Sequence, residues 1–116
     1  MFSLNESNRF MVFGNAVDLR KGIESLCVFV RMNSMVPSDG SVYVFLNRNR
    51  TRMKLLHWER GGYVIFYKRM ERGRISRTVF RTDTECGFML MRWDEIVLLV
   101  EGIAGSARRR KRFNFQ

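Results

Sequence analysis

Apolar and polar residues alternate along three neighbouring segments in the middle of the chain. The alternation predicts half-buried strands over about residues 42–46, 51–58 and 62–70, because successive side chains of a strand point to opposite faces. The connections 47–50 and 59–62 are short, polar and rich in Asn, Arg and Gly, which is typical of tight turns between antiparallel strands. The sequence therefore predicts a three-stranded antiparallel meander.

A helix is predicted before the meander, over residues 16–33. Asn15 suits its N-cap, and Asp18 suits the third position of its first turn, in a pairing that resembles a capping box. The apolar residues of the segment recur at helical spacing on one face. We expect this face to cover the apolar side of the meander and to leave its basic side open. The face consists of Leu19, Ile23, Leu26 and Val30.

Two further segments complete the predicted fold. Residues 9–13 have strand character, and residues 93–103 have the spacing of a short C-terminal helix. The predicted fold class is α+β, with an antiparallel sheet of about four or five strands, one helix packed on a face and the short C-terminal helix. Residues 1–105 are expected to form this single domain, and residues 106–116 a basic, flexible tail.

Composition limits the classes of protein to which the chain can belong. Its 116 residues are 46% hydrophobic and 13% aromatic, which suits one folded domain and excludes a disordered chain. The sequence predicts neither a signal peptide nor a membrane span. Cys27 and Cys86 lie far apart without a CxxC motif, which favours the reducing cytoplasm over a disulfide framework or a zinc site.

Charge is distributed very unevenly along the chain, whose formal net charge is +10. Residues 1–47 are neutral overall, and residues 48–81 carry eleven basic and two acidic side chains. Residues 82–107 have a net charge of −4, and residues 108–116 one of +5. A basic balance that served only solubility would not be concentrated in one block and one tail. The pattern therefore favours an anionic partner such as nucleic acid.

The basic block contains the candidate nucleic-acid-binding residues. Of the 21 basic residues of the chain, 17 are Arg, the side chain that holds phosphate or guanine through two hydrogen bonds. Arg52 and Lys54 are expected on one face of a strand, and a cationic hairpin of this kind can follow a phosphate backbone or enter the major groove. A solvated basic face is the alternative. The candidates are Arg48, Arg50, Arg52, Lys54, Lys68, Arg69, Arg72 and Arg74.

Three aromatic residues are interleaved with these cations. Trp58, Tyr63 and Tyr67 are interpreted as core residues, with stacking on unpaired bases as the alternative. The basic tail, in contrast, allows two interpretations of equal weight. It can be a flexible arm on DNA or a disordered solubilising end. Its basic residues are Arg108, Arg109, Arg110, Lys111 and Arg112.

The sequence predicts no catalytic and no metal site. A two-metal nuclease needs several converging carboxylates, whereas the acidic residues here are scattered along the chain. The sequence contains no glycine-rich phosphate loop, no HExxH motif and no GxSxG motif. His57 has no neighbouring His or Cys, so it is interpreted as a strand residue. The protein is therefore expected not to be an enzyme and to need no cofactor.

Three stretches resemble a known family: VDLRKGIESL at 17–26, VFLNRNRTRMKLLHW at 44–58 and GYVIFYKRMERG at 62–73. They are similar to the accessory protein encoded by the second open reading frame of IS-sixty-six-type bacterial insertion sequences. That protein is often called TnpB and is unrelated to the RNA-guided nucleases of the same name. The resemblance implies that a separate DDE-type transposase of the same element is the partner and performs the strand-transfer chemistry.

Charge and resemblance together predict a non-enzymatic accessory protein for DNA transposition that binds DNA through an Arg-rich hairpin face. The alternative is a protein-interaction subunit that docks on the transposase without binding DNA directly. The matched motifs add Arg20 and Lys21 to the candidate DNA-binding residues. Asp18 and Glu71, in the same motifs, are alternatively expected to form surface ion pairs with neighbouring arginines, which contribute about 0–1 kcal/mol each.

Overall fold

The fold is built around a five-stranded sheet. The computed structural model describes residues 4–76, 79–80 and 87–101. The strand order is β4-β3-β2-β1-β5, and the β1–β2 pair is parallel whereas the other three pairs are antiparallel. The predicted meander is confirmed as β2, β3 and β4. The strands are β1 (Phe10–Phe13), β2 (Val42–Leu46), β3 (Arg52–Glu59), β4 (Gly62–Arg69) and β5 (Phe88–Met91).

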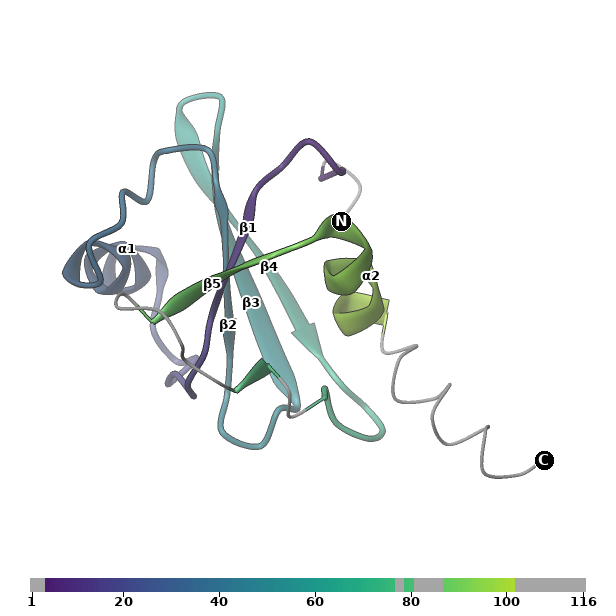
Figure 1. Ribbon diagram of the computed structural model, residues 1–116. Helices are drawn as coiled ribbons and strands as arrows, with labels where there is room; N and C mark the ends of the chain where they lie inside the picture. The colour runs from purple at the N-terminus through teal and green to yellow at the C-terminus, as the bar shows by residue number, and fades with distance from the viewer. Residues whose placement is uncertain (1–3, 77–78, 81–86, 102–116) are drawn as a thin grey trace.

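Two helices lie on opposite sides of this sheet (Figure 1). Helix α1 (Ile23–Met32) connects β1 to β2, and helix α2 (Trp93–Glu101) follows β5. A helical crossover returns the chain in the same direction, which explains why β1 and β2 are parallel. The predicted α+β class is confirmed, and this parallel pair is the departure from the expected antiparallel sheet.

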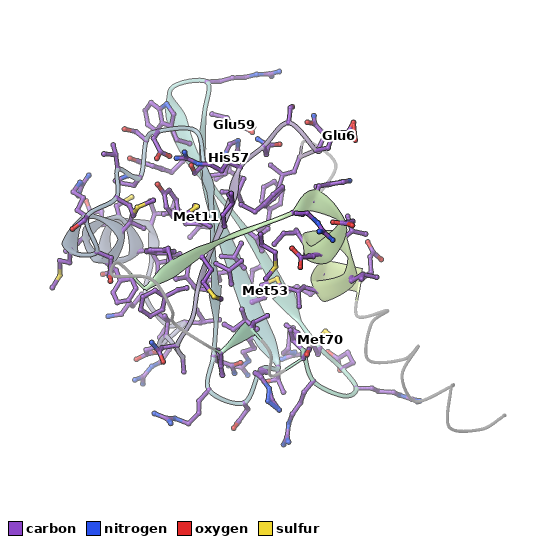
Figure 2. All side chains as sticks on the ribbon, in the orientation of Figure 1. Glu6, Met11, Met53, His57, Glu59 and Met70 are labelled. Atoms are coloured by element: carbon purple, nitrogen blue, oxygen red, sulfur yellow. The ribbon has the colours of Figure 1, made fainter. Side chains whose placement is uncertain are left out.

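Alternation along the strands sends apolar side chains into two separate cores. Phe10, Val44 and Leu55 pack with α2 on one face, whereas Phe45 and Leu56 pack with α1 on the other. All five residues of β2 are buried, as expected for the central strand of a sheet covered on both sides. Met11 and Met53 accordingly point to opposite sides of the sheet in Figure 2.

The predicted helix over residues 16–33 is too long by two turns. Its N-cap is Gly22 rather than Asn15, and the segment before it runs along the sheet, where the Val17 N–H donates to the Leu46 carbonyl at 2.9 Å. Asp18 caps no helix, because its carboxylate accepts the backbone N–H of Arg20 at 3.0 Å in a local turn. Asp side chains form such turns in competition with helix.

The predicted apolar face changes accordingly. Leu26 and Val30 are fully buried from the helix, together with Cys27. Leu19 reaches the same core from the preceding segment, whereas Ile23 is 39% exposed at the first turn. The stripe read from the sequence thus combines residues of a loop and of a helix.

The expectation of an open basic side of the meander is wrong. The face opposite α1 is covered by α2 through Ile96 and Leu99, and by Ile75 and Val79. The predicted basic tail over 106–116 lies outside the described residues. No helix in the described part of the chain is both long enough and apolar enough to cross a membrane.

Gly87 occupies a position that other residues cannot take without strain. Its φ is +82°, and a Cβ built there would lie 2.7 Å from Cε1 of Phe13. We therefore expect Gly87→Ala to lower the free energy of unfolding by about 1–3 kcal/mol, from left-handed strain and overpacking. Urea unfolding measures it. Gly62→Ala is the control, because a Cβ built at Gly62 has no atom within 4 Å. Equal urea midpoints for the two variants would contradict the expected strain at Gly87.

Candidate nucleic-acid interface

The β3–β4 hairpin sets which basic side chains are neighbours. Its loop is Arg60-Gly61, with positive φ values of 52° and 80°, the backbone of a two-residue turn that fixes strand register. In this register Arg52 lies directly opposite Arg69, and Lys54 directly opposite Tyr67. All four side chains are on the α1 face of the sheet.

Helix α1 covers only part of that face. Tyr63 and Ile65, nearer the hairpin loop, pack against the core under α1. Tyr67 and Arg69, two and four residues further along β4, are exposed instead. The end of the hairpin beyond α1 is therefore where this face meets solvent.

The turn between β2 and β3 is held by its own side chains. The Asn47 carboxamide oxygen accepts the backbone N–H groups of Thr51 and Arg52 at 2.9 and 3.0 Å. Arg50 has a positive φ of 58°, and its Nε donates to the carbonyl of Ile75 at 3.1 Å. Arg48, in contrast, is exposed at the tip of the turn.

Lys54 ties the segment before α1 to the sheet. Its Nζ donates to the backbone carbonyl of Lys21 at 3.0 Å and lies 5.6 Å from the centroid of the Tyr67 ring. An ammonium group at this distance is attracted to the aromatic face. The strand, the loop and the tyrosine are thus connected through one half-buried cation.

These segments enclose a hollow of about 920 Å³, which we call the basic groove. Segment 16–20 forms one wall and the turn 47–49 the other, and the side chains of Arg52, Lys54 and Tyr67 complete the lining. Of the sequence-predicted candidates, the groove brings together four. They are Arg20, Arg48, Arg52 and Lys54.

Asp18 brings a negative charge to this wall. The Arg20 guanidinium donates to its carboxylate from Nε at 3.0 Å and from Nη2 at 2.8 Å. These hydrogen bonds hold the pKa of the Asp18 carboxyl well below its usual range, so the pair stays ionised at working pH. Asp18 therefore neutralises Arg20 at the rim of the groove.

Arg52 and Arg69 form a like-charge cross-strand pair, an arrangement that destabilises a sheet. Arg69 is partly compensated, because Nη2 contacts the Glu71 carboxylate at 3.2 Å. Among the described residues, no carboxylate pairs with Arg52. The charge of Arg52 is therefore available for an external anion.

The remaining candidates lie elsewhere. Lys68 points to the opposite face, where its Nζ donates to the carbonyl of Val100 in α2. Lys21 faces the groove region through its backbone carbonyl. Arg72 and Arg74 are exposed in the connection after β4, outside the groove lining. The candidates thus divide into one group around the groove and several dispersed cations.

The core interpretation of the hairpin aromatics holds for Tyr63, which packs against the core under α1, whereas Trp58 is half-buried beside it. Trp58 and Tyr63 pack edge to face with their centroids 4.8 Å apart, whereas Tyr67 is 53% exposed and lines the groove. The sequence pattern favours a core position for Tyr67 and gives base stacking only as the alternative. The signal for a site residue was its pairing with Lys54, which follows only when the register of the two-residue turn is applied.

His57 is a residue of β3, as predicted. It is buried, with Nδ1 3.4 Å from the Ser41 carbonyl oxygen and Nε2 3.5 Å from the Glu59 carboxylate; Figure 2 shows it beside Glu59 near the hairpin loop. Within the described ranges, no three metal-ligating side chains come together.

Comparison with known proteins assigns the family. The family model described as IS66 Orf2-like protein matches residues 8–110. The chain belongs to the IS66 Orf2-like protein family. It is therefore a protein associated with insertion sequences, and the resemblance found in the sequence is confirmed.

One relative of this IS66 Orf2-like protein comes from Sinorhizobium fredii. It is called uncharacterized protein y4jC and is 28% identical over 104 residues, which cover 89% of this chain and 86% of the relative. No solved structure matches the chain.

The like-charge pair generates a prediction about stability. We expect Arg52→Gln to raise the free energy of unfolding by about 0.2–1 kcal/mol at low salt, because it removes repulsion with Arg69. The gain should shrink at about 1 M salt, where charges are screened within about 3 Å. Denaturant titrations at both salt concentrations measure it. Arg72→Gln, outside the sheet, is the control, and an Arg52→Gln protein less stable than this control at low salt would refute the repulsion.

Proposed function

We propose that this protein is a non-enzymatic accessory factor of transposition that binds DNA through the basic groove and the adjacent Arg69. The grouping of basic side chains from three separate segments around one hollow carries the proposal. Guanidinium groups bind phosphate oxygens in pairs of hydrogen bonds. The family supports the setting, because an insertion sequence is mobilised as DNA.

The charges of the groove are arranged for an external anion rather than for internal pairing. Arg48 and Arg52 are exposed and have no carboxylate partner in the described ranges. Lys54 is half-buried in the lining of the groove, where its Nζ donates to the Lys21 carbonyl. A fixed cation flanked by exposed arginines suits a chain of phosphates.

The second candidate function is docking on the DDE transposase of the same element without direct DNA binding. The outer side of α1 favours it, because Val28 and Met32 are 49% and 77% exposed there. Exposed apolar side chains of this kind are typical of protein-binding surfaces. The two candidates use different surfaces, so variants of the groove separate them.

The first test removes two charges from the groove. We expect Arg48→Gln/Arg52→Gln to weaken DNA binding by at least about tenfold and to lower the log–log salt slope by about 2 for duplex DNA, because each contact contributes about 0.9. Fluorescence anisotropy with labelled oligonucleotides from about 50 to 200 mM salt measures both quantities.

The control for this test is Arg9→Gln/Arg92→Gln, which changes the net charge equally but away from the groove. Equal losses in the two double variants would mean that only total charge matters. Absence of DNA binding by the wild type at 50 mM salt would contradict the proposal. A transposase complex that survives nuclease treatment would then favour docking.

The second test adds a charge by releasing Arg20 from Asp18. We expect Asp18→Asn to tighten DNA binding and to steepen the salt slope by up to about 0.9, since one more arginine reaches phosphate. Asp94→Asn is the matched control, because Asp94 forms a comparable exposed pair with Arg92 on α2. The same anisotropy titration applies. If both variants tightened binding equally, the effect would come from net charge and not from the groove.

A further inference from the structure

We propose that the basic groove binds single-stranded DNA, with an unpaired base stacked on Tyr67. This inference rests on the proposed function and specifies its ligand. It is carried by the exposure of one aromatic ring among the cations, a feature that does not depend on charge alone.

Tyr67 differs from every other aromatic residue of the hairpin. Tyr67 is 53% exposed, whereas the rings of Trp58 and Tyr63 pack against each other edge to face. In the described part of the chain, no other aromatic ring packs on Tyr67. The Lys54 ammonium lies 5.6 Å from the centroid of its ring. Since β4 is the edge strand of the sheet, no further strand of the described residues flanks the ring on its outer side.

The surroundings of Tyr67 match the composition of a nucleotide. Lys54 lies directly across the strand pair from Tyr67, and the next pair on the same face is Arg52 with Arg69. An aromatic platform therefore adjoins two guanidinium groups that can hold the phosphates on either side of a stacked base. Proteins that bind single strands combine these two elements, a cationic track and aromatic platforms.

The exposure of the Tyr67 ring separates single strands from duplexes. A duplex presents its phosphates on the outside of a rod with its bases stacked inside. A duplex can contact Arg20 and Arg48, but its bases are stacked on one another and are not free to lie on the Tyr67 ring. A strand with a free base can do both.

The groove is also expected to tolerate many sequences. The amide oxygen of Asn47, which could read a base edge, accepts two backbone N–H groups of its own turn, and its Nδ2 donates to the Thr51 hydroxyl at 3.1 Å. Stacking and phosphate contacts do not depend on base identity.

The test compares a single-stranded oligonucleotide with a hairpin duplex of the same sequence at equal salt. The wild type is expected to bind the single strand more tightly. Tyr67→Leu should weaken single-strand binding by about five- to 150-fold, the range for loss of one stacked base, and should leave duplex binding within about twofold. Tyr67→Phe keeps the ring and should retain the affinity. Tyr63→Leu, on the same face of the same strand, is the control.

A spectroscopic measurement keeps the inference testable apart from affinity. An oligonucleotide that contains 2-aminopurine should lose fluorescence on binding to the wild type and to Tyr67→Phe, because its base stacks on the ring, but not on binding to Tyr67→Leu. Equal or tighter binding of the duplex, with Tyr67→Leu affecting both ligands alike, would overturn the single-strand assignment and leave DNA binding intact. Tighter binding of the matching RNA would also overturn it. Failure of the wild type to bind either DNA would overturn the proposed function as well.

Discussion

The site depends on the partial cover that α1 gives to one face of the sheet. Tyr63 and Ile65 of β4 pack against the core under α1, whereas Tyr67 and Arg69 on the same face of the strand are exposed. Alternation sends Leu56 and Ile65 beneath the helix and Lys54 and Tyr67 beyond it. The same face therefore forms a dry core at one end and a charged hollow at the other.

The length of α1 itself follows from the preceding segment. Residues 17–20 continue the helical spacing of the sequence but do not form helix. The Val17 N–H donates to the Leu46 carbonyl at the end of β2, and the Asp18 carboxylate accepts the Arg20 N–H in a local turn. This segment becomes a wall of the groove. The basic block on the hairpin and the motif before α1 are distant in the sequence but meet in one place.

Much of the fold follows from the sequence pattern, and part of the site does not. Period-two alternation and two short turns are sufficient to predict β2, β3 and β4 from the sequence, and they place Arg52 and Lys54 on one face of a strand. The four apolar residues of β5 show no period in the sequence, so they do not predict a strand by themselves, and the place of β5 beside β1 is set by tertiary pairing. Lys68 was grouped with the other cations by sequence proximity, although alternation across the turn places it opposite Met53 and toward α2. Tyr67 required both the register and the short reach of α1, neither of which is local.

The central claim is that DNA occupies the basic groove, and a nuclear magnetic resonance titration locates the ligand most directly. The ¹⁵N-labelled protein would be titrated with a short single-stranded oligonucleotide, and amide shifts would be mapped along the chain. We expect the largest shifts in segments 16–20, 47–54 and 66–69, which line the groove or adjoin its lining. Shifts concentrated on the outer side of α1 or on α2, with these segments unchanged, would contradict it.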